Sequence, residues 1–81
     1  MNMESVAVLR WISSGTVARG EDAVVAELEP ALIDAVRGNG LTPRGDMRVR
    51  QVDPSEYPQT LAAKPDDDPG AMLHLAEVDV D

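Results

Sequence analysis

Residues 21–37 form the one long segment whose apolar spacing fits a helix, and every other element must be arranged around it. Pro30 interrupts this segment, yet it lies opposite the centre of the apolar stripe, where water can satisfy the freed carbonyl. We therefore predict one kinked helix, or two short ones in register, that ends at Gly38-Asn39-Gly40. Its apolar residues recur at intervals of three and four and form one core-facing stripe: Val24, Val25, Leu28, Ala31, Leu32, Ala35 and Val36.

Three shorter segments favour strands. Residues 46–52 (DMRVRQV) and 71–80 (AMLHLAEVDV) alternate apolar and polar side chains with a period of two. Residues 6–12 (VAVLRWI) are rich in β-branched side chains, although Ser13-Ser14-Gly15 could equally end a short helix there. We predict a strand, because a lone two-stranded hairpin would be only marginally stable.

The order of elements is then β-α-β-β within a single domain, since residues 1–81 leave no room for a second core. The helix must cross from the first strand to the second, and we predict that the third strand lies between them, antiparallel to both. The expected fold is a small α+β domain with a mostly antiparallel three-stranded sheet of order 1-3-2. The helix covers one face of it, and the proline-rich residues 53–70 form a loop between the second and third strands.

Charged residues in the second and third strands suggest how these strands pair. One register sets Arg48 opposite Asp79 and Arg50 opposite Glu77 on the face away from the helix. Opposite charges that face each other across two strands contribute roughly 0.2–1 kcal/mol per pair. Because a change of register would lose these pairs, we predict this one.

Composition and charge argue against several classes of function. The chain has no cysteine, which excludes a disulfide framework and a thiolate zinc site. Its net charge of −8 opposes direct binding to nucleic acid and to anionic membranes, both of which need a cationic surface. The first residues carry Glu4 and no base before Arg10, so we expect no signal peptide and no membrane span. The cytoplasm of a bacterial host cell, with a bacterial or phage gene, is the expected setting.

Residues 64–70, KPDDDPG, place three consecutive aspartates between two prolines. A calcium loop needs oxygen ligands at alternate positions with a glycine at position 6, and this spacing fails after Asp66 and Asp68. Pro69 and Gly70 are typical of a turn that leads into a strand. We interpret the stretch as a solvated turn and predict no metal.

Two further motifs point away from catalysis. Residues 15–20, GTVARG, have the glycine spacing of a phosphate loop, but Glu21 and Asp22 follow where that motif needs lysine and a hydroxyl residue. We interpret the stretch as a flexible connection whose acids suit the dipole of the next helix. His74 is the only histidine, and nothing places a nucleophile beside it, so we predict a partly buried structural histidine. We expect neither an enzyme nor a cofactor.

The polar side of the predicted helix is one candidate contact surface. Charged helix faces are usually only solvated, but acids in a row can also mimic a phosphate backbone. Glu27 and Asp34 are the candidates for meeting a basic partner, and Ile33 interrupts the polar side as a small apolar island. The charged residues on this side are five acids and one base: Glu21, Asp22, Glu27, Glu29, Asp34 and Arg37.

The sheet face that the helix leaves uncovered is the stronger candidate, because one helix covers only one face. The alternation puts Val52, Leu73 and Leu75 there. The first strand adds either Leu9 and Trp11 or its other, equally apolar side. Contiguous apolar patches on small domains mark interaction sites, and Trp11 is the natural hot spot.

The sequence therefore predicts a small acidic protein-binding module that is regulatory or inhibitory, such as a phage-encoded host-directed factor, an antitoxin or an adaptor. One alternative is a structural subunit that self-associates through the same sheet face, in a homo-oligomer or a phage particle. A second alternative is an inhibitor that mimics nucleic acid through the acidic helix side. Each of these needs a protein partner or a second copy, and none needs nucleic acid, a membrane or a cofactor.

Overall fold

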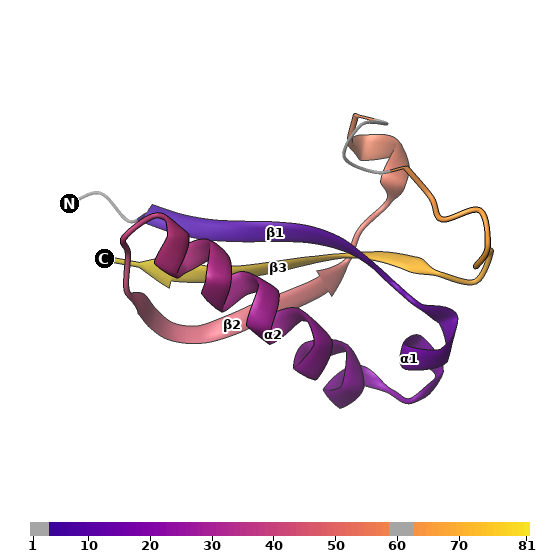
Figure 1. The fold of residues 1–81 in the computed structure, drawn as a ribbon, viewed down its shortest axis with the longest axis horizontal. Helices are drawn as coiled ribbons and strands as arrows, with labels where there is room; N and C mark the ends of the chain where they lie inside the picture. The colour runs from indigo at the N-terminus through magenta and orange to yellow at the C-terminus, as the bar shows by residue number, and fades with distance from the viewer. Residues whose placement is uncertain (1–3, 59–62) are drawn as a thin grey trace.

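The computed structural model describes residues 4–58 and 63–81 of the chain. Strands β1 (Glu4–Ile12), β2 (Pro43–Gln51) and β3 (Met72–Val80) form one sheet of order β1-β3-β2. Strand β3 is antiparallel to both neighbours, and helix α2 (Glu21–Gly38) lies across one face of the sheet (Figure 1). The predicted α+β class and strand order are confirmed.

The core lies between α2 and the sheet. The helix buries Val24, Leu28, Leu32 and Val36, which recur every four residues along its inner side. Fully burying a leucine or valine side chain contributes roughly 1.5–3 kcal/mol, so this stripe holds the helix to the sheet. The strands contribute only small and branched apolar side chains to the same cluster: Val8, Ile12, Ala76, Val78 and Val80.

Helix α2 runs through Pro30 without interruption, and Pro30 is exposed, as its position opposite the apolar stripe predicts. The helix ends where expected. Gly40 has a φ of +69°, a left-handed conformation that glycine adopts at little cost. The Asn39 side-chain amide donates to the carbonyl of Ala35 at 2.7 Å, and the Leu41 amide donates to the carbonyl of Val36 at 3.1 Å. These bonds satisfy carbonyls that the last turn leaves free.

A short helix, α1 (Ser14–Ala18), occupies residues that we predicted to be a flexible connection, and that prediction is wrong. Ser13 caps this helix: its hydroxyl oxygen accepts from the amide of Thr16 at 3.3 Å. A serine with an extended backbone is a favoured start of a helix. Ser13 therefore begins a helix instead of ending one, and the predicted strand before it is confirmed and extends back to Glu4.

Strand β2 begins at Pro43, three residues earlier than the alternation predicts. Pro43 can be the first residue of an edge strand, because no neighbour there needs its amide. The pairing with β3 shifts between Arg44 and Arg48, and Gly45, within that stretch, has a φ of +80°. Between these two pairs β2 advances four residues and β3 only two, and such an irregularity at a glycine bends the strand.

The predicted register between β2 and β3 is wrong. Arg48 faces Glu77 instead of Asp79, and Arg50 faces Leu75 instead of Glu77. The displacement is two residues, which keeps every side chain on its predicted face. Arg48 still pairs with its predicted partner Asp79, because its long side chain reaches both Glu77 and Asp79.

The three aspartates of residues 64–70 divide into two kinds. Asp66 and Asp67 are exposed in a turn, as predicted. Asp68 is half-buried, and a carboxylate oxygen accepts from the amide of Ser14, the first residue of α1, at 2.9 Å. This hydrogen bond holds the pKa of Asp68 below its usual value. The prediction of a purely solvated turn is therefore wrong for Asp68, which fastens the turn to α1.

Gly70 continues this contact between the turn and α1. A β-carbon at this position would lie 2.9 Å from the β-carbon of Ser14, closer than side chains approach one another. Earlier in the same connection, the short helix η1 (Pro54–Glu56) follows Asp53, whose carboxylate accepts from the amide of Ser55 at 2.9 Å. Residues 59–62 of the predicted loop lie outside the described residues. Within the described ranges, no helix is long and apolar enough to cross a membrane.

Candidate protein-interaction site

The sheet has a face that α2 does not cover, which we call the open face. Odd-numbered residues of β1 and β3 lie on it, since their even-numbered neighbours Val8, Ala76 and Val78 pack in the core under α2. The pairing register arranges the open face in rows across the sheet. Toward the β1 C-terminus these rows are mostly apolar, and toward the β1 N-terminus they are polar and charged.

Four of the five residues that the sequence predicts to touch a partner on the open face are partly exposed in its apolar half. Leu9 lies directly opposite Leu75, and both are half-buried. Trp11 and Val52 are half-buried in the next row. The structure therefore selects the orientation of β1 that places Leu9 and Trp11 on this face. We call Leu9, Trp11, Val52 and Leu75 the apolar patch.

Leu73 lies on the open face as predicted, but it does not belong to the apolar patch, and its predicted exposure is wrong. It lies opposite Trp11 on the central strand, and only 1% of it is exposed. The amide of Val52 donates to the Leu73 carbonyl at 3.0 Å, which brings a second large neighbour beside it. Leu75 lies on the same middle strand between Leu9 and Arg50 and stays partly exposed, so position on the middle strand alone does not bury Leu73.

The indole nitrogen of Trp11 adds a polar feature to the patch. This Nε1 atom is buried and has no hydrogen-bond partner among the described residues. Tryptophan usually satisfies its N–H when that group is buried. The rest of the side chain is half-exposed, so Trp11 presents apolar area at the edge of the patch.

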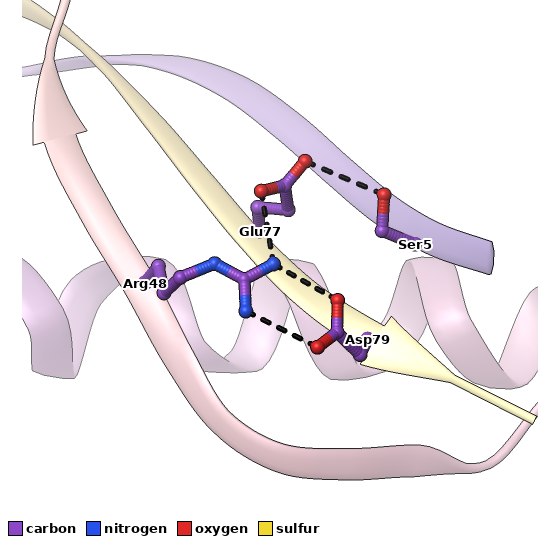
Figure 2. A network of polar contacts seen from close by, with 4 residues as sticks. All are labelled: Ser5, Arg48, Glu77 and Asp79. Carbon is purple, nitrogen blue, oxygen red and sulfur yellow. Dashed lines mark hydrogen bonds and ion pairs between the residues drawn. The ribbon is translucent and has the colours of Figure 1, made fainter. Parts of the chain in front are cut away.

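The other half of the open face carries a hydrogen-bonded charge network, which Figure 2 shows on the side of the sheet away from α2. One Arg48 guanidinium nitrogen lies 3.0 Å from Glu77 and 3.0 Å from Asp79, and the other lies 3.3 Å from Asp79. Ser5 donates from its hydroxyl to the second oxygen of Glu77 at 3.3 Å. Arg44 pairs with Asp81 at 3.0 Å. The network joins all three strands.

These hydrogen bonds shift the ionisation of the groups that make them. Asp79 and then Glu77 raise the pKa of Arg48, and Arg48 in turn lowers the pKa of Asp79. The Arg48 side chain is 53% exposed, so solvent screens these pairs and their effect on stability is small. The network therefore sets the orientation of its side chains more than it stabilises the fold.

A shallow pocket lies where the two halves of the open face meet. Leu75 contributes apolar surface to it, and Arg48, Arg50 and Glu77 contribute charged groups. Arg50 lies opposite Leu75 in the register and is exposed. Among the described residues, no carboxylate pairs with Arg50, so its charge is available at the border of the apolar patch.

The predicted acidic side of α2 is exposed, and the structure divides its candidate residues. Asp34 is exposed on the outer surface. Glu27 accepts from the Thr16 hydroxyl at 3.5 Å, which links it to α1. Ile33 is half-buried and lines a groove between α2 and β2 together with Glu29 and Met47. It is part of a groove wall and not an isolated apolar island.

His74 occupies the predicted structural position. It lies on the side of β3 that faces α2, it is 8% exposed, and its Nδ1 atom is 3.0 Å from the Met72 carbonyl oxygen. It also lines a small pocket with Glu21 and Gln51 beside the start of α2. Within residues 4–58 and 63–81, no three acidic or histidine side chains are placed to hold a metal ion.

Sequence reasoning placed Arg48 and Arg50 on the open face but missed Arg44, which lies outside the predicted strand. Among the described residues, the open face carries three arginines and three carboxylates, Arg44, Arg48, Arg50, Glu77, Asp79 and Asp81, while the outer side of α2 keeps an acidic excess. The alternation of β2 extended back to residue 44 would have revealed Arg44, because it shares the even-numbered positions of Arg48 and Arg50. Comparison with protein-family models, with curated proteins and with solved structures finds no match for this chain.

Proposed function

We propose that this protein is a non-catalytic protein-binding module whose contact surface is the open face. The observation that carries the proposal is the apolar patch on the face of the sheet away from α2. Leu9 and Leu75 meet across two strands there, with Trp11 beside them. Large aromatic and aliphatic side chains on a flat surface of a small domain are typical of an interaction site.

The balance of charge supports the same surface. The chain has a net charge of −8, yet among the described residues the strands place three arginines and three carboxylates on the open face. Interfaces are depleted of unpaired charge at their centre, because each desolvated charge without a partner costs free energy. Because the acidic excess lies on α2, the open face is suited to contact with a protein partner and the outer side of the helix is suited to contact with water.

Arg50 suggests the chemistry of the partner. Its exposed guanidinium borders Leu75 and lines the shallow pocket with Arg48 and Glu77. A partner that inserts an apolar side chain beside Leu75 and presents a carboxylate next to it would satisfy both groups. Guanidinium groups bind carboxylates in a two-pronged geometry, which would fix the orientation of the complex.

The non-catalytic part of the proposal rests on the position of the only histidine. His74 is buried, and its Nδ1 atom is directed at a backbone carbonyl, which is the geometry of a structural side chain. The cytoplasmic setting also stays part of the proposal. A chain without cysteine needs no oxidising compartment to form its fold.

The test compares two charge-changing variants on opposite sides of the molecule. Leu75→Asp should abolish capture of a partner from a lysate of the native host, whereas Asp34→Lys should capture it as the unmodified protein does. Circular dichroism must show the same helix content in both variants. Arg50→Glu is a second open-face variant that avoids the apolar patch, and it should weaken capture too. Loss of capture by Asp34→Lys alone would move the site to the acidic helix side.

A further inference from the structure

The outer edge of β1 is open along its whole length, since no described strand pairs with it beyond β3 (Figure 1). The direction in which the β1 amide and carbonyl groups point can be derived from one hydrogen bond between the end of β2 and β3. Val52 donates to the carbonyl of Leu73, so odd-numbered residues of β3 direct their backbone groups toward β2. In an antiparallel pair these directions alternate from residue to residue. Even-numbered residues of β3 and β1 therefore bond to each other.

The backbone amide and carbonyl groups of Ser5, Ala7 and Leu9 consequently point outward from the sheet. The Arg10 side chain uses one of these outward groups, because its Nη1 atom donates to the Leu9 carbonyl at 2.9 Å. The Arg10 side chain thus lies along the outer edge of β1 and donates a hydrogen bond to one of the carbonyl oxygens there.

The two edges of the sheet differ in how they resist further pairing. The β2 edge begins with Pro43, is bent at the Gly45 bulge and carries three arginines on one side. Prolines, bulges and like charges are the features that block edge-to-edge pairing. Strand β1 pairs with β3 in an unbroken register from Glu4 to Ile12 and contains neither proline nor glycine. Only β1 offers a regular edge.

We propose that two copies of this protein pair through the outer edges of β1, antiparallel and centred on Ala7. The Glu4 of each copy then faces the Arg10 of the second copy, and Val6 faces Val8. These facing residues form the pairs without backbone hydrogen bonds, in which side chains approach most closely. The same edge is thereby complementary to itself, as a two-fold contact requires.

The charge pair selects this register from its neighbours. Centring the contact on Val6 would set Glu4 opposite Val8, and centring it on Val8 would set Glu4 opposite Ile12. Only the Ala7-centred register places both Glu4 carboxylates opposite an Arg10 guanidinium. Opposite charges that face each other across strands favour pairing, and a charge opposite an apolar residue does not.

Pairing replaces the weak bond that Arg10 makes in the single chain. The amide of Ser5 in the second copy donates to the Leu9 carbonyl, and the Arg10 guanidinium forms an ion pair with Glu4 of that copy. Ala7 bonds to Ala7 at the centre, and Ser5 and Leu9 bond to each other on either side. Each facing pair exchanges two backbone hydrogen bonds. The result is a continuous six-stranded sheet with both open faces on the same side.

This inference goes beyond the proposed function and does not depend on it, because the edge of β1 is distinct from the apolar patch. Sedimentation equilibrium over a wide concentration range should show reversible formation of a species with the mass of two chains. Arg10→Glu and Glu4→Arg alone should each weaken association by about tenfold or more, since each creates two like-charge contacts. The double variant Glu4→Arg/Arg10→Glu should restore it. Leu75→Asp, on the open face, should leave it unchanged.

A disulfide tests the register directly, because the natural chain has no cysteine. Ala7→Cys places two thiols opposite each other at about 5.5 Å between α-carbons, within the range of a disulfide. Ser5→Cys is the control, since its two thiols would be about 13 Å apart along the strands. Oxidation should cross-link the first variant and not the second. A chain that stays monomeric at all concentrations, a cross-link in Ser5→Cys alone, or a double variant that fails to recover would each overturn the proposal.

Discussion

The two sides of the sheet show how one small domain separates stability from contact. The side under α2 buries an uncharged cluster of valine, leucine, isoleucine and alanine, and the outer surface of the helix carries the acids. The open face combines the apolar patch with a charge network whose members are exposed or partly exposed. Burial of apolar area stabilises the fold, whereas exposed ion pairs contribute little. From this difference we expect the same substitution to change the free energy of unfolding by different amounts on the two sides of the sheet.

The largest contrast is expected between two leucines on opposite sides of the sheet. Leu32→Ala removes a side chain that is 1% exposed in the core and should cost about 2–5 kcal/mol, a large share of the stability of an 81-residue domain. Leu75→Ala, on the open face, should cost much less because this side chain is already partly hydrated. Urea titration of both variants measures the difference. Equal costs would mean that the open face is part of the core.

A second contrast uses the same substitution at two glycines. Gly70→Ala brings a β-carbon to 2.9 Å from Ser14 and should destabilise the protein by about 1–3 kcal/mol, because the turn must move away from α1. Gly38→Ala, at the end of α2, meets nothing within 4 Å and should be neutral or stabilise by up to about 1 kcal/mol. Thermal melting of both variants separates them. A neutral Gly70→Ala would show that the turn does not depend on this close approach.

The regular elements could be predicted because their signals are local. The apolar stripe of α2 and the alternation in β3 each lie within a few turns or residues, and both are found where the spacing places them. The uncovered face follows from the same spacing, since one helix covers one side of a sheet. Leu9 and Trp11 could be listed as candidates but not assigned, because both sides of β1 are apolar.

The remaining features depend on contacts between distant residues. The pairing of β2 shifts at the Gly45 bulge, which an alternation of side chains does not show. Leu73 and Leu75 share one face of the middle strand, yet only Leu73 is buried, and the alternation cannot show this difference. The role of Asp68 depends on Ser14, fifty-four positions earlier in the chain. Three equivalent aspartates in the sequence cannot show which one meets α1.

The hydrogen bond between Asp68 and Ser14 predicts a pH dependence of stability. The folded state holds the pKa of Asp68 below its unfolded value of about 3.9. The stabilisation is therefore complete above that value and is lost as the pH falls through the lower, folded pKa. Asp79, held low by Arg48, and Asp53, held low by Ser55, act in the same direction. Unfolding free energies measured between pH 6 and pH 2 should decline in this range.

Two variants assign the contribution of Asp68. Asp68→Asn should lower stability at neutral pH and flatten the decline, because the amide oxygen accepts from Ser14 without a charge. Asp66→Asn is the matched control in the same turn, where the carboxylate is exposed, and it should leave the curve as it is. Identical curves for the two variants would contradict the assigned difference between the aspartates.

The smallest effect is expected from the charge network on the open face. Arg48→Met removes the guanidinium that joins Glu77 and Asp79, and the melting temperature should fall less than in Gly70→Ala because all three side chains are largely or partly exposed. The difference from the unmodified protein should vanish in 1 M sodium chloride, where charges are screened beyond about 3 Å. Arg50→Met, whose guanidinium pairs with no described carboxylate, is the control and should not destabilise the protein at either salt concentration. A large, salt-independent loss in Arg48→Met would show that the open face stabilises the fold as the core does, and would remove the distinction between the two sides of the sheet.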